Sequence, residues 1–89
     1  MALLDLLGRR WVLRILFELR EGPLKFRLLQ ERCEGMSPSV LSQRLKELVE
    51  ADILAAGEDG AYGFTESGNR LRLLLRPLGA WSADWAKRK

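Results

Sequence analysis

The chain has 89 residues, a length that suits one small domain, and 47% of its residues are hydrophobic. It carries 15 Lys and Arg against 12 Asp and Glu, and this net charge of +3 favours an anionic partner. One cysteine and no histidine leave no intramolecular disulfide, no usual zinc or iron ligand set and no Ser/His or Cys/His nucleophile. We therefore expect neither an enzyme nor a protein with a metal or other cofactor.

The hydropathy pattern also bears on location and assembly. No apolar run approaches the roughly 20 residues that a membrane span needs, and the first residues do not resemble a signal peptide. We expect a cytoplasmic protein without a membrane partner. Its apolar content is more than so small a core easily buries, which favours a homo-oligomer.

Two helices are predicted in the first quarter of the chain. Residues 1–7 contain four leucines and predict a short apolar helix, which Gly8 separates from the next element. Residues 9–20 predict an amphipathic helix that ends before Gly22 and Pro23. Its apolar side chains follow the helical repeat: Val12, Ile15, Leu16 and Leu19.

The next two helices are close together in the sequence. Residues 25–33 have apolar side chains at helical spacing, and Glu34 and Gly35 end that helix. Ser37 and Pro38 start another, because serine can cap free N–H groups and proline fits the first helical position. We expect this helix at residues 38–51. The short glycine-containing turn before it is typical of a helix-turn-helix unit.

The last part of the chain predicts a hairpin and a long helix. Residues 53–56 and 61–64 are expected to be strands joined by a turn at 57–60, and Thr65 can cap the helix that follows. Pro77 predicts either a kink or two short helices that meet near Arg76, because it removes a hydrogen bond. Five apolar residues of this helix have the spacing of a packing seam: Leu71, Leu74, Leu78, Trp81 and Trp85.

The helix expected at residues 38–51 has two different faces. Leu41, Leu45 and Leu48 lie within one narrow arc. Glutamine and serine can read base edges and lysine can bind phosphate, which suits a helix in a DNA major groove. The alternative is an ordinary solvated face beside a core stripe. The polar set opposite the leucines is Ser39, Gln43, Lys46 and Glu50, flanked by Ser42.

A series of short motifs covers nearly the whole chain. They are Leu-Leu-Asp-Leu-Leu-Gly-Arg-Arg-Trp (3–11), Gly-Pro (22–23), Phe26, Met-Ser (36–37), Leu-Ser-Gln-Arg-Leu-Lys-Glu-Leu (41–48), Tyr-Gly-Phe-Thr-Glu-Ser-Gly (62–68) and Trp81. In this order and spacing the chain resembles the HxlR-type family of winged-helix transcriptional regulators, relatives of the MarR group. The resemblance implies a mainly α (α+β) winged helix-turn-helix with a two-stranded β-hairpin wing. It also implies a homodimer formed by the terminal helices.

Site residues follow from the resemblance and from the helical wheel. By position, the resemblance places Ser37, Pro38, Ser39, Ser42, Gln43 and Arg44 against double-stranded DNA, and the wheel adds Lys46. Lys25 and Arg27 start the helix that crosses the DNA backbone in such units, so we expect them to bind phosphates. The acidic wing tip, Glu58 and Asp59, is not expected to do so. The expected dimer interface is Leu3, Leu4, Leu7, Trp11, Leu71, Leu74, Leu78, Trp81 and Trp85.

We therefore expect residues 1–89 to be a single DNA-binding domain, a sequence-specific regulator that acts as a homodimer on a palindromic or pseudo-palindromic operator. The alternative is a winged-helix protein-interaction module that does not bind DNA, which the modest charge and acidic wing tip favour. Cys33 is interpreted as a core residue rather than a thiol sensor. The tryptophans are interpreted as core or interface, although an effector ligand is compatible with them.

Overall fold

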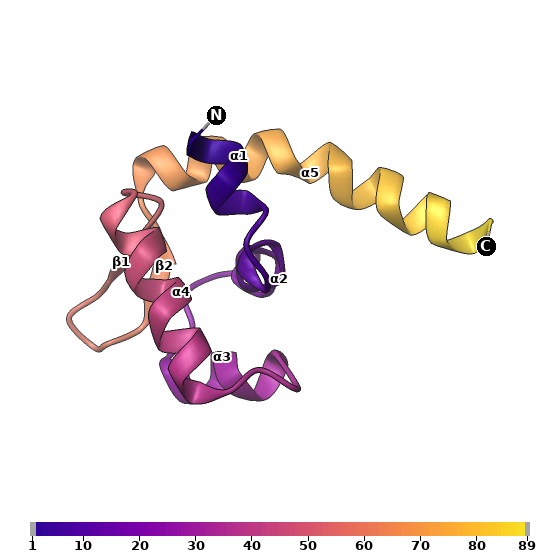
Figure 1. The fold of residues 1–89 in the computed structure, drawn as a ribbon. Helices are drawn as coiled ribbons and strands as arrows, with labels where there is room; N and C mark the ends of the chain where they lie inside the picture. The colour runs from indigo at the N-terminus through magenta and orange to yellow at the C-terminus, as the bar shows by residue number, and fades with distance from the viewer. Residues whose placement is uncertain (1, 89) are drawn as a thin grey trace.

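The computed structural model describes residues 2–88, which form helices packed beside a two-stranded hairpin (Figure 1). The order of elements agrees with the prediction, and the mainly α winged helix-turn-helix is confirmed. The elements are α1 (Ala2–Leu7), α2 (Val12–Glu18), α3 (Phe26–Arg32), α4 (Pro38–Glu50), β1 (Leu54–Ala56), β2 (Tyr62–Phe64) and α5 (Glu66–Lys87).

The core lies between α2, α3, α4 and the base of the hairpin. The three leucines predicted to hold α4, Leu41, Leu45 and Leu48, are at most 1% exposed. The four apolar residues of the predicted second helix are buried as well, and Cys33 joins them from the end of α3. The three helices are therefore held together because each buries one apolar face in the shared core.

Two side-chain caps position the functional elements. The Ser37 hydroxyl accepts a hydrogen bond from the Val40 N–H at 3.2 Å, and Pro38 is the first residue of α4. At the start of α5, the Thr65 hydroxyl accepts a hydrogen bond from the Gly68 N–H at 2.9 Å. Both helix starts were predicted from these residues, and both are confirmed.

Two predicted features of the helices differ from the structure. Helix α2 begins at Val12 rather than at Arg9, because Trp11 has a φ of 78°, a left-handed conformation that cannot continue a right-handed helix. Helix α5 is continuous through Pro77, so the alternative of two short helices is wrong. A proline costs a helix one hydrogen bond, and the residues on both sides of Pro77 nevertheless stay helical.

The wing is attached to the helix-turn-helix unit. Strands β1 and β2 are antiparallel, with Leu54 opposite Phe64. Leu24, just before α3, forms an additional bridge to Tyr62. The Leu24 N–H donates to the Tyr62 carbonyl at an N···O distance of 3.0 Å, and the Tyr62 N–H donates to the Leu24 carbonyl at 2.8 Å. Gly68 is buried at the base of the wing, against the carbonyl of Ile53. The hairpin therefore contacts both the start of α3 and the start of α5.

Helix α5 has two halves with different surroundings. Its first half packs on the core through Leu71 and Leu75, whereas its second half extends away from the other elements toward the C-terminus (Figure 1). Large apolar side chains remain exposed along this second half. No helix among residues 2–88 combines the length and the apolar character that crossing a membrane requires.

Candidate nucleic-acid interface

The outer face of α4 presents the predicted polar side chains together. Ser39, Gln43 and Lys46 are exposed opposite the buried leucines, and Ser42 is exposed at the flank of this set. The face lies directly after the α3–α4 turn, in which Gly35 has a φ of 91° that favours glycine. A helix of 13 residues whose exposed face has short polar side chains in its first turns has the shape that a major groove admits.

The start of α4 is also exposed. The hydroxyl of Ser37 serves as the helix cap and lies 3.3 Å from the Ser39 hydroxyl, so these two serines share a hydrogen bond. Pro38 is exposed beside them. These small side chains allow a phosphate to approach the positive end of the helix dipole.

The three basic residues that were expected to bind phosphates are exposed: Lys46 on this face, and Lys25 and Arg27 at the start of α3. Lys25 is the N-cap residue of α3, and Arg27 lies in its first turn. Within residues 2–88 none of their side chains forms a hydrogen bond or an ion pair with another residue. Their charges are therefore available to phosphates.

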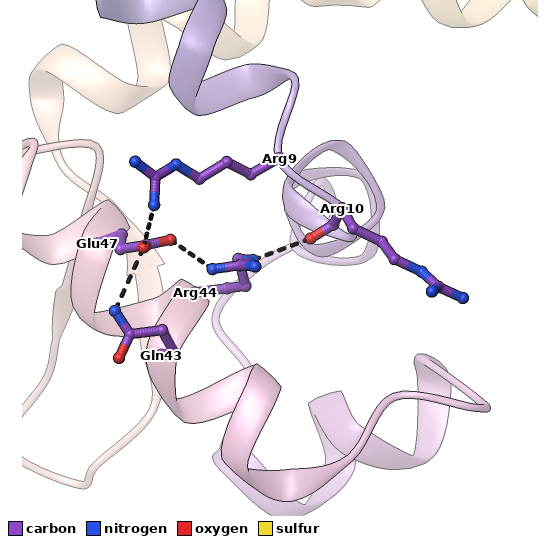
Figure 2. Close-up of polar contacts among 5 residues, drawn as sticks. All are labelled: Arg9, Arg10, Gln43, Arg44 and Glu47. Carbon is purple, nitrogen blue, oxygen red and sulfur yellow. Dashed lines mark hydrogen bonds and ion pairs between the residues drawn. The ribbon is translucent and has the colours of Figure 1, made fainter.

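Glu47 organises a polar cluster beside this face, which Figure 2 shows. Its Oε2 accepts hydrogen bonds from Arg9 Nη1 at 2.5 Å and from Gln43 Nε2 at 3.3 Å. Its Oε1 accepts one from Arg44 Nη1 at 2.9 Å, and Arg44 Nε donates to the Arg10 carbonyl at 3.0 Å. Two residues expected to face DNA, Gln43 and Arg44, are thus joined to the α1–α2 turn.

The charge state of this cluster follows from its contacts. Burial raises the pKa of the Glu47 carboxyl, but hydrogen bonds from Gln43 and Arg44 and the charges of Arg44 and Arg9 outweigh that effect. The net result is a pKa below the usual value. Glu47 is therefore ionised at neutral pH, and as a carboxylate it only accepts hydrogen bonds.

Sequence reasoning missed Glu47. A signal was present, because Glu47 lies four residues after Gln43 and three after Arg44, spacings at which helix side chains meet. The contact with Arg9 joins positions 38 residues apart, and no local pattern indicates it. Arg44 was expected to reach a phosphate from the edge of the core; in the structure its side chain is 21% exposed and points to the α1–α2 turn.

The wing tip carries two exposed acidic side chains. Asp59 Oδ1 accepts a hydrogen bond from the Ala61 N–H at 3.0 Å and so closes the turn between the strands. Glu58 is exposed beside it. Because both carboxylates would repel phosphates, the tip itself is a poor DNA contact.

The residues expected at the dimer interface form two groups. Leu7, Trp11 and Leu71 are partly buried and pack on the core of the chain itself. The indole of Trp11 lies against Gly35, where an added Cβ would be 3.7 Å from Trp11 Cη2. The second group is exposed, from 40% to 77% of each residue: Leu3, Leu4, Leu74, Leu78, Trp81 and Trp85.

Comparison with known proteins identifies this arrangement. A family model described as HxlR-like helix-turn-helix matches residues 6–89. The chain belongs to the HxlR-like helix-turn-helix family. The uncharacterized HTH-type transcriptional regulator YvaP of Bacillus subtilis is 32% identical over 87 residues, which cover 91% of this chain and 81% of that protein.

Solved structures of HxlR-like proteins have the same fold. The quinone-bound YodB of Bacillus subtilis is 31% identical and has a TM-score of 0.82, with 93% of this chain and 92% of that chain covered. A possible HxlR family transcriptional factor from Thermoplasma volcanium is 26% identical, with a TM-score of 0.85 and coverage of 98% and 84%. This chain is accordingly a DNA-binding transcriptional regulator, and the alternative of an interaction module finds no support. The names of its relatives describe regulators rather than enzymes.

Cys33 of this HxlR-like chain is a core residue, as predicted. Its side chain is fully buried at the end of α3. Burial raises the pKa of the Cys33 thiol, the charge of Glu18 raises it further, and that of Arg14 opposes the shift. The thiol is therefore protonated and shielded from reagents in the folded chain.

Proposed function

We propose that this HxlR-like regulator binds DNA as a homodimer, with α4 of each protomer in the major groove of a palindromic or pseudo-palindromic site. The observation that carries the proposal is the outer face of α4, where Ser39, Ser42 and Gln43 are exposed together and Lys46 has no partner among residues 2–88. Serine and glutamine supply the donors and acceptors that base edges require, and the lysine supplies a charge for phosphate.

A second copy of the chain is the partner that the exposed apolar side chains support. Trp81 and Trp85 stack at a centroid distance of 6.2 Å on the part of α5 that leaves the domain. Beside them, a groove of about 660 Å³ between α2 and α5 has Leu13, Phe17 and Leu78 among its lining residues. Apolar surface of this extent is costly in water, and a symmetric interface would bury it twice.

The symmetry of the dimer sets the form of the operator. Two α4 helices related by a two-fold axis enter successive major grooves, so the half-site centres should lie about 34 to 36 Å apart, one turn of DNA. Lys25 and Arg27 would then contact the backbone beside each half-site.

Selection of bound sequences from random duplex DNA tests the proposal. We expect enrichment of an inverted repeat with that spacing. Gln43→Ala should lower affinity for the selected site by about 1 to 3 kcal/mol, because a base contact is lost. Lys25→Ala should lower the affinity for all DNA sequences alike and reduce the salt dependence of that affinity. Absence of any enriched sequence, or equal losses on selected and random duplex for Gln43→Ala, would contradict base reading by α4.

Sedimentation equilibrium tests the dimer separately. Trp81→Glu should shift the protein to monomer, because a charge would replace an apolar contact of the interface. Ala83→Glu is the matched control: the residue is exposed on the same helix, roughly 200° around from Trp81. A Trp81→Glu variant as dimeric as the Ala83→Glu variant would show that this face of α5 is not the interface.

A further inference from the structure

One carboxylate holds two residues of the proposed DNA-reading helix. Glu47 accepts hydrogen bonds from Gln43 through Oε2 and from Arg44 through Oε1, and Arg9 contacts Oε2 from outside α4. The Glu47 side chain is 14% exposed, whereas the side chain of Arg9 is 52% exposed. Glu47 is thus an inner anchor between the α1–α2 turn and the outer face of α4 (Figure 2).

The contact determines how the Gln43 amide is presented. A carboxylate only accepts hydrogen bonds, so Gln43 must turn its NH2 group toward Glu47. One amide N–H is used by that bond. The second N–H and the carbonyl Oε1 have no partner among residues 2–88. A donor and an acceptor held side by side in this way match the N7 and N6 positions of adenine in the major groove.

We propose that Glu47 is a positioning residue for base readout, which fixes the Gln43 amide in the orientation that favours adenine and is itself held by Arg9. The inference rests on the proposed placement of α4 in the major groove. It adds that sequence preference depends on two residues that do not touch the bases. Without this anchor, the glutamine side chain rotates about three bonds. The conformational entropy lost when it is ordered on DNA then offsets part of the binding free energy of the base contact.

Arg9 gives the anchor a second fixed point. It belongs to the turn between α1 and α2, and Arg44 binds the backbone of the same turn through the Arg10 carbonyl. The guanidinium of Arg10 points away from Glu47 (Figure 2). It lies over the Trp11 ring, 5.7 Å from the ring centroid. Arg9 and Arg10 carry the same charge, but of these two side chains only that of Arg9 contacts Glu47.

The experiment measures discrimination, defined as the ratio of affinities for a selected duplex and for duplexes changed at one base pair. Glu47→Gln should reduce discrimination at the Gln43 position by about tenfold, within the range one bidentate base contact supplies. Its affinity for random duplex should rise, because a negative charge near the phosphates is removed. Glu50→Gln is the control, because Glu50 is exposed on α4 and has no partner among the described residues. Removal of its charge should raise affinity for random duplex without loss of discrimination.

Arg9→Met and Arg10→Met form a second matched pair with equal loss of charge. Only Arg9→Met should reduce discrimination, and Arg9→Lys should restore part of it. In a double-mutant cycle, Glu47→Gln added to Gln43→Ala should cause no further loss of discrimination. Thermal melts of each variant identify any that fails to fold, and the Arg9 pair then provides the test for Glu47.

The outcomes separate the two proposals. Equal discrimination in Glu47→Gln and Glu50→Gln, or additive losses in the cycle, would overturn the role of Glu47 while leaving DNA binding intact. A native protein that prefers no duplex over random DNA would instead overturn the proposed function, and the role of Glu47 with it.

Discussion

Gly68 permits the closest approach between α5 and the wing, and its replacement by alanine should destabilise the protein. A Cβ at this position would lie 1.9 Å from the Ile53 carbonyl oxygen and 2.8 Å from its carbon. Both atoms belong to the backbone, so no side-chain rotation relieves the overlap. The start of α5 must therefore move away from the segment that leads into β1.

The cost can be worked from the contacts at this junction. The Ile53 oxygen accepts hydrogen bonds from the Thr65 N–H at 3.0 Å and from the Thr65 hydroxyl at 3.3 Å. Weakening both costs about 1 kcal/mol each. Overpacking of a buried site adds about 1 to 3 kcal/mol, and the better helix propensity of alanine returns up to about 1 kcal/mol. We expect a net loss of about 3 kcal/mol, or a fall in Tm of roughly 15 °C for a domain of this size.

Thermal and urea unfolding followed by circular dichroism, at one fixed protein concentration, provide the measurement. Gly79→Ala is the matched control, because Gly79 lies in the same helix and an added Cβ there meets no atom within 4 Å. That variant should be as stable as the native protein or slightly more so. A fall in Tm of less than about 4 °C for Gly68→Ala, equivalent to about 1 kcal/mol, would refute the packing argument.

Three further predictions concern single side chains. Thr65→Ala should lower the free energy of unfolding, measured by urea titration, by about 1 kcal/mol, because it removes the hydroxyl that caps α5 by accepting the Gly68 N–H. Thr65→Ser keeps a hydroxyl and should recover most of this loss. Cys33 should react with a thiol reagent far more slowly in buffer than in urea; equal rates would show that it is not shielded. The lowered pKa of Glu47 stabilises the folded state above the unfolded value of about 4.3, and this contribution is lost as the pH falls through the lower folded value. The difference in urea midpoint between native protein and Glu47→Gln should therefore narrow on acidification, and a constant difference would contradict the ion pairing.

Much of the fold could be predicted because its signals are local. Ser37 and Pro38 start α4 through contacts within one helical turn, and Leu41, Leu45 and Leu48 follow the helical repeat. The start of α2 could not be predicted in the same way. Trp11 takes a left-handed conformation and packs its indole against Gly35, which is far away in the sequence. Tertiary packing outweighs the local helical pattern at that point.

The candidate site divides in a similar way. The polar face of α4 could be predicted from a wheel, because the buried leucines leave Ser39, Ser42 and Gln43 outward. The wheel says nothing about how a long side chain is held. The orientation of Gln43 depends on Glu47, and that of Glu47 on Arg9, which approaches from another element. Such a chain of contacts requires the folded arrangement.

The bridge between Leu24 and Tyr62 divides the wing into an attached base and a free end. At the bridge, two backbone hydrogen bonds join the first residue of β2 to the segment before α3. Beyond it, residues 57–60 form an exposed turn. Insertions at this turn should therefore be tolerated without displacing α3 or α4. For protein engineering, the wing tip is therefore a suitable place for a basic loop or a fluorescent label, because the helix-turn-helix unit should keep its arrangement.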